Sequence, residues 1–244
     1  MTMDIPSYRA TRDIDFLAIT SNDLEEIRNL ITQICRVKAS PDGLHFDTRT
    51  IICRPITEDS EYHGVRVRFK TFMDRSRIDM QIDLGIGDVI HPKPVSISLR
   101  SILNNSHVVK LKGYTTESVI AEKLQAMANL GLVNSRIKDF FYIWFLSRNF
   151  DFEGNRLGTA IEKTFERRKT EIPTAFESFL RDYSQDPVNQ SRWAAFLTRL
   201  DLKSVPDQFK QTVMAIVDFI LPVIESLAEN QAFTKTWKAP GPWK

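Results

Sequence analysis

Two aspartates near the start of the chain have the spacing that a metal site needs. Asp13 and Asp15 open a short apolar run that ends at Ile19 and predicts a β-strand. Side chains two residues apart on a strand point to the same face, about 6–7 Å apart, so both carboxylates would point to one place. Neighbouring carboxylates repel each other unless a cation lies between them. Mg²⁺ prefers oxygen ligands and keeps positions for substrate phosphates, so the pattern predicts a magnesium site.

A third carboxylate for this site is predicted on a later strand. In residues 78–84 apolar side chains alternate with polar ones, and Asp83 lies on the polar face. A site for two ions about 4 Å apart needs such a third ligand. The alternative is that the first two aspartates form only a solvated turn or helix cap, as most such pairs do. The strand-like continuation and the basic residue Arg12 before Asp13 favour the metal site.

The elements that must position these residues divide the chain near Gly113. Before it, a helix is expected over 24–37, capped by Ser21 or Asn22, with strands over 44–56, 65–73, 78–84 and 95–99. After it, helices are expected near 115–130, 135–150, 156–168, 174–183, 190–200 and 208–229. The pattern predicts an α+β fold, in which a helix on a mixed or antiparallel sheet precedes an all-helical domain. The predicted domains are a core at 1–112, a helical domain at 113–232 and an extended surface tail at 233–244.

Four segments carry a resemblance to a known family. They are YRATRDIDFL at 8–17, IDLGIGD at 82–88, ESVIAEKL at 117–124 and RIKDF at 136–140. In this order and spacing they resemble the motifs of the AbiEii/AbiGii nucleotidyltransferase-like toxins of abortive-infection systems, a branch of the polymerase-beta-like superfamily. The likeness covers about residues 8–150. It implies a minimal nucleotidyltransferase core followed by helices.

The resemblance also implies roles for single residues. Asp13, Asp15 and Asp83 would hold two Mg²⁺ ions, and Lys123 would face the NTP together with Arg12. Asp83, Lys123 and Asp139 would be the catalytic groups. For Lys123 and Asp139 the residues alone favour a plainer interpretation, in which the lysine is solvated and the aspartate stabilises a helix start.

The implied reaction moves a nucleoside monophosphate from an NTP to an acceptor hydroxyl, and an RNA such as tRNA is a candidate acceptor. The implied biological setting is a toxin–antitoxin or phage-defence system, with a cognate antitoxin as partner.

Two departures from the family pattern qualify this expectation. The family carries a strand that ends in a Gly-Ser or Gly-Gly turn before its aspartates, and here no glycine precedes Asp13. The chain is therefore expected to be N-terminally truncated, which makes its own activity uncertain. Where the family often has a further aspartate, this chain has Tyr142. The alternatives are a catalytically silent nucleotide-binding or protein-interaction member, or a fragment that does not fold alone.

Composition excludes several other classes of protein. Lys and Arg number 33 against 31 Asp and Glu, so the net charge of +2 does not indicate a nucleic-acid binder. The spacing of histidines and of Cys35 and Cys53 matches no zinc motif, and no P-loop motif is present. The longest apolar stretch, 215–227, is broken by Asp218, Pro222 and Glu225, and the N-terminus lacks a signal-peptide pattern. A cytoplasmic protein without a membrane partner is expected.

Overall fold

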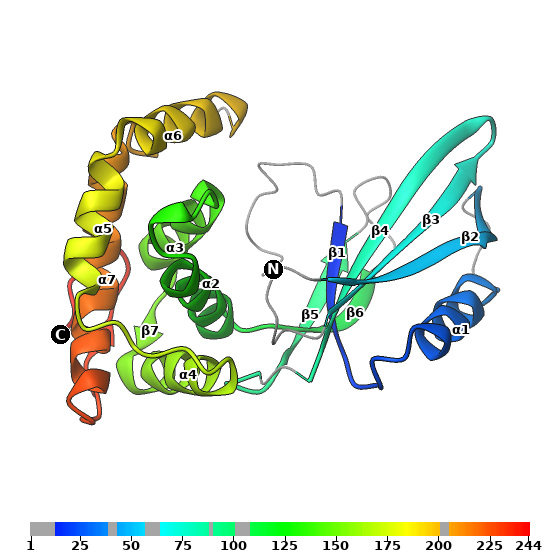
Figure 1. The fold of residues 1–244 in the computed structure, drawn as a ribbon. Coiled ribbons are helices and arrows are strands. Elements are labelled where there is room, and N and C mark those ends of the chain that lie inside the picture. Colours follow the sequence, from blue (N-terminus) through cyan, green and yellow to red (C-terminus); the bar gives the residue numbers. More distant parts are fainter. Residues whose placement is uncertain (1–12, 39–42, 57–63, 88–89, 101–107, 201–204) are drawn as a thin grey trace. The chain divides into compact units, whose positions relative to one another are not determined.

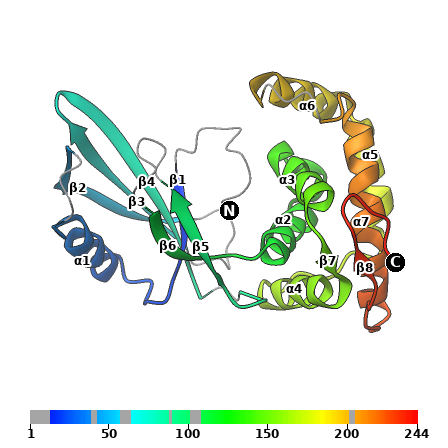
Figure 2. The same cartoon turned by 180° about the vertical axis from the view of Figure 1, so that it is seen from behind.

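The structure is a computed structural model that describes residues 13–38, 43–56, 64–87, 90–100, 108–200 and 205–244. Arg12, and the side chain of Asp13, lie outside the described part. The chain divides into two compact units, one of residues 10–88 and one containing residues 89–244. Figures 1 and 2 show the elements of both from opposite sides, and each unit is described by itself.

The first unit is a four-stranded mixed sheet with one helix. Its elements are β1 (Asp13–Ala18), α1 (Leu24–Cys35), β2 (Leu44–Ile56), β3 (Gly64–Met73) and β4 (Ser76–Ile86). The strand order is β1-β4-β3-β2. β1 pairs in parallel with β4, whereas β2, β3 and β4 form an antiparallel meander. The predicted mixed sheet is thus confirmed.

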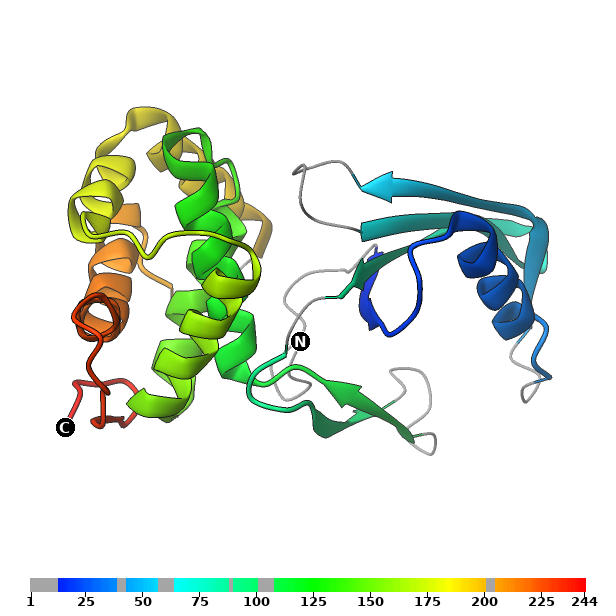
Figure 3. The same cartoon turned by 60° about the horizontal axis from the view of Figure 1, so that its bottom comes forward.

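Helix α1 covers one face of this sheet, as Figure 3 shows. Its buried side chains Ile27 and Ile31 pack in a cluster with alternate residues of β3, among them Val65 and Val67. Asp23 caps the helix by accepting a hydrogen bond of 2.8 Å from the backbone N–H of Glu26, so the prediction of Ser21 or Asn22 as the cap was wrong. Because side chains alternate along a strand, the remaining positions of β3 and β4 point to the face opposite α1.

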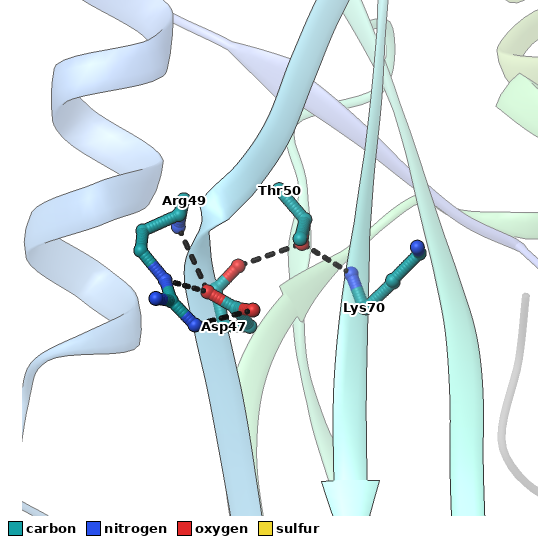
Figure 4. A network of polar contacts seen from close by, with 4 residues as sticks. All are labelled: Asp47, Arg49, Thr50 and Lys70. Atoms are coloured by element: carbon teal, nitrogen blue, oxygen red, sulfur yellow. Dashed lines mark hydrogen bonds and ion pairs between the residues drawn. The ribbon is translucent and has the colours of Figure 1, made fainter.

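A polar network bridges an irregularity between β2 and β3 (Figure 4). The pairing register shifts between Asp47 and Ile52. There the Thr50 hydroxyl donates to the Asp47 carbonyl at 2.7 Å and accepts from the Lys70 backbone N–H at 2.9 Å. The Thr50 hydroxyl thus accepts the hydrogen bond that a backbone carbonyl of β2 would accept from Lys70 in a regular sheet. Beside it, a hydrogen bond from the Arg49 guanidinium lowers the pKa of the Asp47 carboxyl.

The second unit holds a β-hairpin and a helical bundle. The hairpin pairs β5 (Val95–Arg100) with β6 (Val108–Gly113). The helices are α2 (Thr116–Leu130), η1 (Gly131–Val133), α3 (Ile137–Asn149), α4 (Gly154–Arg167), α5 (Phe176–Gln185), α6 (Pro187–Leu200) and α7 (Phe209–Ala228). The α+β class and the succession of helices after residue 113 are confirmed. The hairpin groups with the helices in this second compact unit.

Helix α7 packs against α3, α4, α5 and α6. Among the described residues it alone has the length and apolar composition that could cross a membrane. Ile216, Phe219 and Ile220 are fully buried in the main hydrophobic cluster together with residues of α2 to α6, whereas Met214 on the same helix is 50% exposed. The buried side of α7 is thus part of the core of the bundle.

The C-terminal tail packs into the bundle. Strand β8 (Thr236–Trp237) pairs with β7 (Phe152–Glu153), and Trp237 is only 3% exposed. Its indole N–H donates to the Ser147 carbonyl at 2.7 Å, and its ring contacts that of Phe219 at 4.9 Å between centroids. The tail is extended, but the expectation that it only lies on the surface was wrong for Trp237, because no local pattern marks a partner so distant in sequence.

We expect the Trp237→Ala variant to lose about 3–5 kcal/mol of unfolding free energy, because it removes a buried aromatic side chain and orphans the Ser147 carbonyl. Urea unfolding followed by circular dichroism measures the loss. The control is Lys238→Ala, which removes an exposed ion pair with Asp151 and should change stability far less. Equal stability of Trp237→Ala and wild type would contradict this packing.

Candidate functional site

The pairing of β1 with β4 brings two of the three predicted metal ligands side by side. The parallel register places Asp15 opposite Asp83, and Asp13 opposite Gln81. Paired strands lie about 4.8 Å apart, so Asp15 and Asp83 are immediate neighbours on the face of the sheet opposite α1. Asp15 is exposed and Asp83 is half-buried. The structure therefore supplies the adjacency that the metal prediction needs.

Asp83 is held by an arginine of the next strand, which the sequence reasoning missed. Arg66 Nε donates to Asp83 Oδ1 at 2.8 Å, and Arg66 Nη2 donates to Oδ2 at 2.7 Å. Gln81 lies on the same face, where its side-chain amide approaches Asp83 Oδ2 at 3.4 Å and accepts from Arg68 Nε at 2.9 Å. The acidic pair of β1 and β4 thus borders a row of basic residues on β3.

The donor set fits Mg²⁺ in its chemistry. Carboxylate oxygens are the ligands that this ion prefers, and each accepts more than one interaction, so the arginine pair leaves lone pairs on Asp83. Within the ranges the structure describes, however, no three His, Cys, Asp or Glu side chains are gathered as a metal site. The Asp13 side chain lies outside those ranges, and both oxygens of Asp83 already accept hydrogen bonds from Arg66.

A second charged group joins α2 to α3 in the helical unit. Lys123 Nζ donates to Asp139 Oδ1 at 2.8 Å, and Arg136 Nε lies 3.1 Å from Oδ2. The Asp139 side chain is 1% exposed and that of Lys123 is 20% exposed. Lys123 also lies over the ring of Tyr142, with Nζ 4.9 Å from the centroid. Lys123 is therefore a fixed, partly buried cation and not the solvated residue of the plainer interpretation.

The pair keeps some capacity for further bonds. An ammonium group has three N–H donors, and a fifth of the Lys123 side chain is open to solvent. Among the described contacts, Asp139 Oδ2 accepts no hydrogen bond of regular geometry. Asp15 and Asp83 belong to the first unit, Lys123 and Asp139 to the second, and the structure assembles each pair within its own unit.

Sequence reasoning passed over Arg66, Arg136 and Tyr142 as partners of these groups. A signal for Arg66 exists, since Arg66, Arg68 and Lys70 alternate with the buried residues of β3 and so share the polar face. Only the β3–β4 register shows that Arg66 stands opposite Asp83. Tyr142 stands where the family often has an aspartate, and its ring contacts Lys123, the lysine of the family motif.

We expect the Lys123→Met variant to lose about 2–4 kcal/mol of stability, because it leaves the buried Asp139 carboxylate with Arg136 as its remaining cation. Thermal and urea unfolding measure this loss. The matched control is Lys163→Met on α4, whose lysine forms a surface pair with Glu166 and should change stability by less than about 0.5 kcal/mol. Equal effects of the two substitutions would contradict a buried ion pair.

Comparisons with known proteins place the chain in a family. No individually curated protein matches the sequence. Two crystal structures from Helicobacter pylori match, each with a TM-score of 0.44. One, of a protein described as a proposed nucleotidyltransferase, is 13% identical and covers 94% of this chain and 85% of its own. The other, JHP933, is 14% identical and covers 93% and 81%. Residues 3–215 match the family described as the nucleotidyl transferase AbiEii toxin of type IV toxin–antitoxin systems. The chain therefore belongs to the AbiEii nucleotidyltransferase toxin family.

Proposed function

We propose that the chain is a Mg²⁺-dependent nucleotidyltransferase that moves a nucleoside monophosphate from an NTP to an acceptor hydroxyl, with an RNA such as tRNA as the acceptor. It acts in the cytoplasm as the toxin of a pair with a cognate antitoxin. Family membership supports the transferase class and the antitoxin partner. The observation that carries the proposal is the register that sets Asp15 beside Asp83 on one face of the sheet.

In the proposed reaction the acceptor oxygen forms a bond to the α-phosphorus while the bond from that phosphorus to the bridging oxygen breaks. Pyrophosphate leaves, and the hydroxyl proton is released. Asp13, Asp15 and Asp83 are the residues that would hold two Mg²⁺ ions. When bound, these ions neutralise phosphate charge and lower the pKa of the attacking hydroxyl.

The protein's own cations complete the proposed chemistry. Lys123 supplies a compact positive charge to the triphosphate, and its ammonium group has three N–H donors, one of which bonds to Asp139. Asp139 and the Tyr142 ring hold its ammonium group in one place, so little order has to be gained when the nucleotide binds. Arg12, next to Asp13 in the sequence, is proposed as a further phosphate contact.

A second candidate function is a catalytically silent member that binds nucleotide or protein. The Arg66–Asp83 pair favours it, because a carboxylate whose two oxygens both accept from a guanidinium resembles a structural ion pair. A measured transfer activity that depends on the aspartates would decide between the two functions.

We expect purified wild-type protein, incubated with Mg²⁺, α-labelled NTPs and total cellular RNA, to label an RNA band. Asp15→Asn should lower the initial rate at least about 100-fold, because it removes a charge on which metal binding depends. Its matched control is Asp79→Asn, which changes an exposed aspartate of β4 paired with Arg77 and should keep the wild-type rate. Equal rates for both variants would reject the metal role of Asp15. No transfer from folded wild type would support the silent alternative.

A further inference from the structure

The polar face of the sheet carries an acidic band and a basic band side by side. Asp15 on β1 and Asp83 on β4 form the acidic band, and Arg66 and Arg68 on β3 form the basic band. The strand order places β4 between β1 and β3. Asp83 therefore has a carboxylate on one side and a guanidinium on the other, and through it the two bands interact directly.

We propose that Arg66 is the resident counter-ion of Asp83 and opposes divalent-cation binding there, so that an arginine on the neighbouring strand sets the metal affinity of the acidic site. The inference rests on the proposed function, because it assumes that Asp83 is a metal ligand. It adds a residue that positions Asp83 and tunes the site.

The first support is the geometry of the pair. Nε and Nη2 of Arg66 each donate to one of the two carboxylate oxygens of Asp83, at 2.8 and 2.7 Å. Such a two-bond arrangement is the strongest that these groups form. The side chains are 33% and 14% exposed, so water screens the pair less than it would screen a surface pair. A cation that approaches Asp83 therefore meets a carboxylate that already has a partner.

The second support is charge balance. Asp15 lies directly opposite Asp83, and two carboxylates so close together repel unless a positive charge compensates them. Arg66 provides that charge within the protein itself. A divalent ion supplies the same compensation from outside, so the two cations compete for one carboxylate, and binding of the ion requires Arg66 to share or leave Asp83.

Arg68 offers an internal comparison. It lies two residues from Arg66 on the same strand and the same face, but its guanidinium donates to the side-chain amide of Gln81 at 2.9 Å. Removal of Arg68 therefore deletes an equal charge at nearly the same place without releasing a carboxylate. A difference in metal affinity between variants of the two arginines therefore measures the effect of the Arg66–Asp83 pair. The overall positive charge of the basic band would affect both variants alike.

Mn²⁺ titration followed by electron paramagnetic resonance tests the proposal, since the signal of the free aquo ion disappears on binding. We expect Arg66→Gln to lower the Kd for Mn²⁺ by about tenfold, the size expected for loss of one neighbouring charge. Arg68→Gln should leave the Kd within about twofold of wild type. In an Asp83→Asn background, Arg66→Gln should have no effect on the residual Mn²⁺ affinity.

Other outcomes overturn the inference in distinguishable ways. An unchanged or weaker Kd in Arg66→Gln, or an equal shift in Arg68→Gln, overturns it and leaves the proposed function standing. No Mn²⁺ binding by folded wild type and folded Arg66→Gln at millimolar concentrations overturns both. If Arg66→Gln does not fold, Arg66→Lys replaces it. Lysine keeps the charge but cannot form the two-bond contact with Asp83. A Kd for Mn²⁺ lower than those of both wild type and Arg68→Gln supports the proposal, and any other value overturns it.

Discussion

The parallel pairing of β1 with β4 is the constraint on which the rest of the candidate site depends. β4 already pairs with β3 on its other edge, so Gln81 and Asp83 on its polar face each have one neighbour from each strand. Asp83 consequently lies between Asp15 and Arg66. A shift of one residue in either register would turn these side chains to the face covered by α1, where charged groups would be buried without partners.

In each unit an aspartate of the candidate site is paired with a cationic side chain. Asp83 accepts two hydrogen bonds from Arg66, and the buried Asp139 lies between Lys123 and Arg136. Burial of an unpaired carboxylate would cost several kcal/mol, so these cations are needed for folding whatever else they do. The same contacts fix the orientation of the groups that the proposed chemistry would use. At both aspartates, the residues that stabilise the fold would therefore also position the groups of the proposed reaction.

Family membership and local geometry bear on different questions. Membership in the AbiEii family indicates a nucleotidyltransferase toxin with an antitoxin partner. The contacts of Asp83 support the proposal that Arg66 adjusts its affinity for a cation. An active enzyme and a silent relative would share the fold and the Lys123–Asp139 pair, and they would differ in whether a divalent ion can compete with Arg66.

The sequence by itself determined the α+β class, the change to helices after Gly113 and the polar face that carries Asp83, because strand and helix periodicity are local properties. Motif spacing also indicated the family. Only the tertiary structure decided that β1 pairs with β4, that Arg66 holds Asp83, and that Lys123 reaches Asp139 beside Tyr142. It also decided that Trp237 is buried against Ser147. Each of these contacts joins residues distant in the chain, and it depends on strand order and helix packing, which the free energy of the whole fold selects and no local pattern encodes.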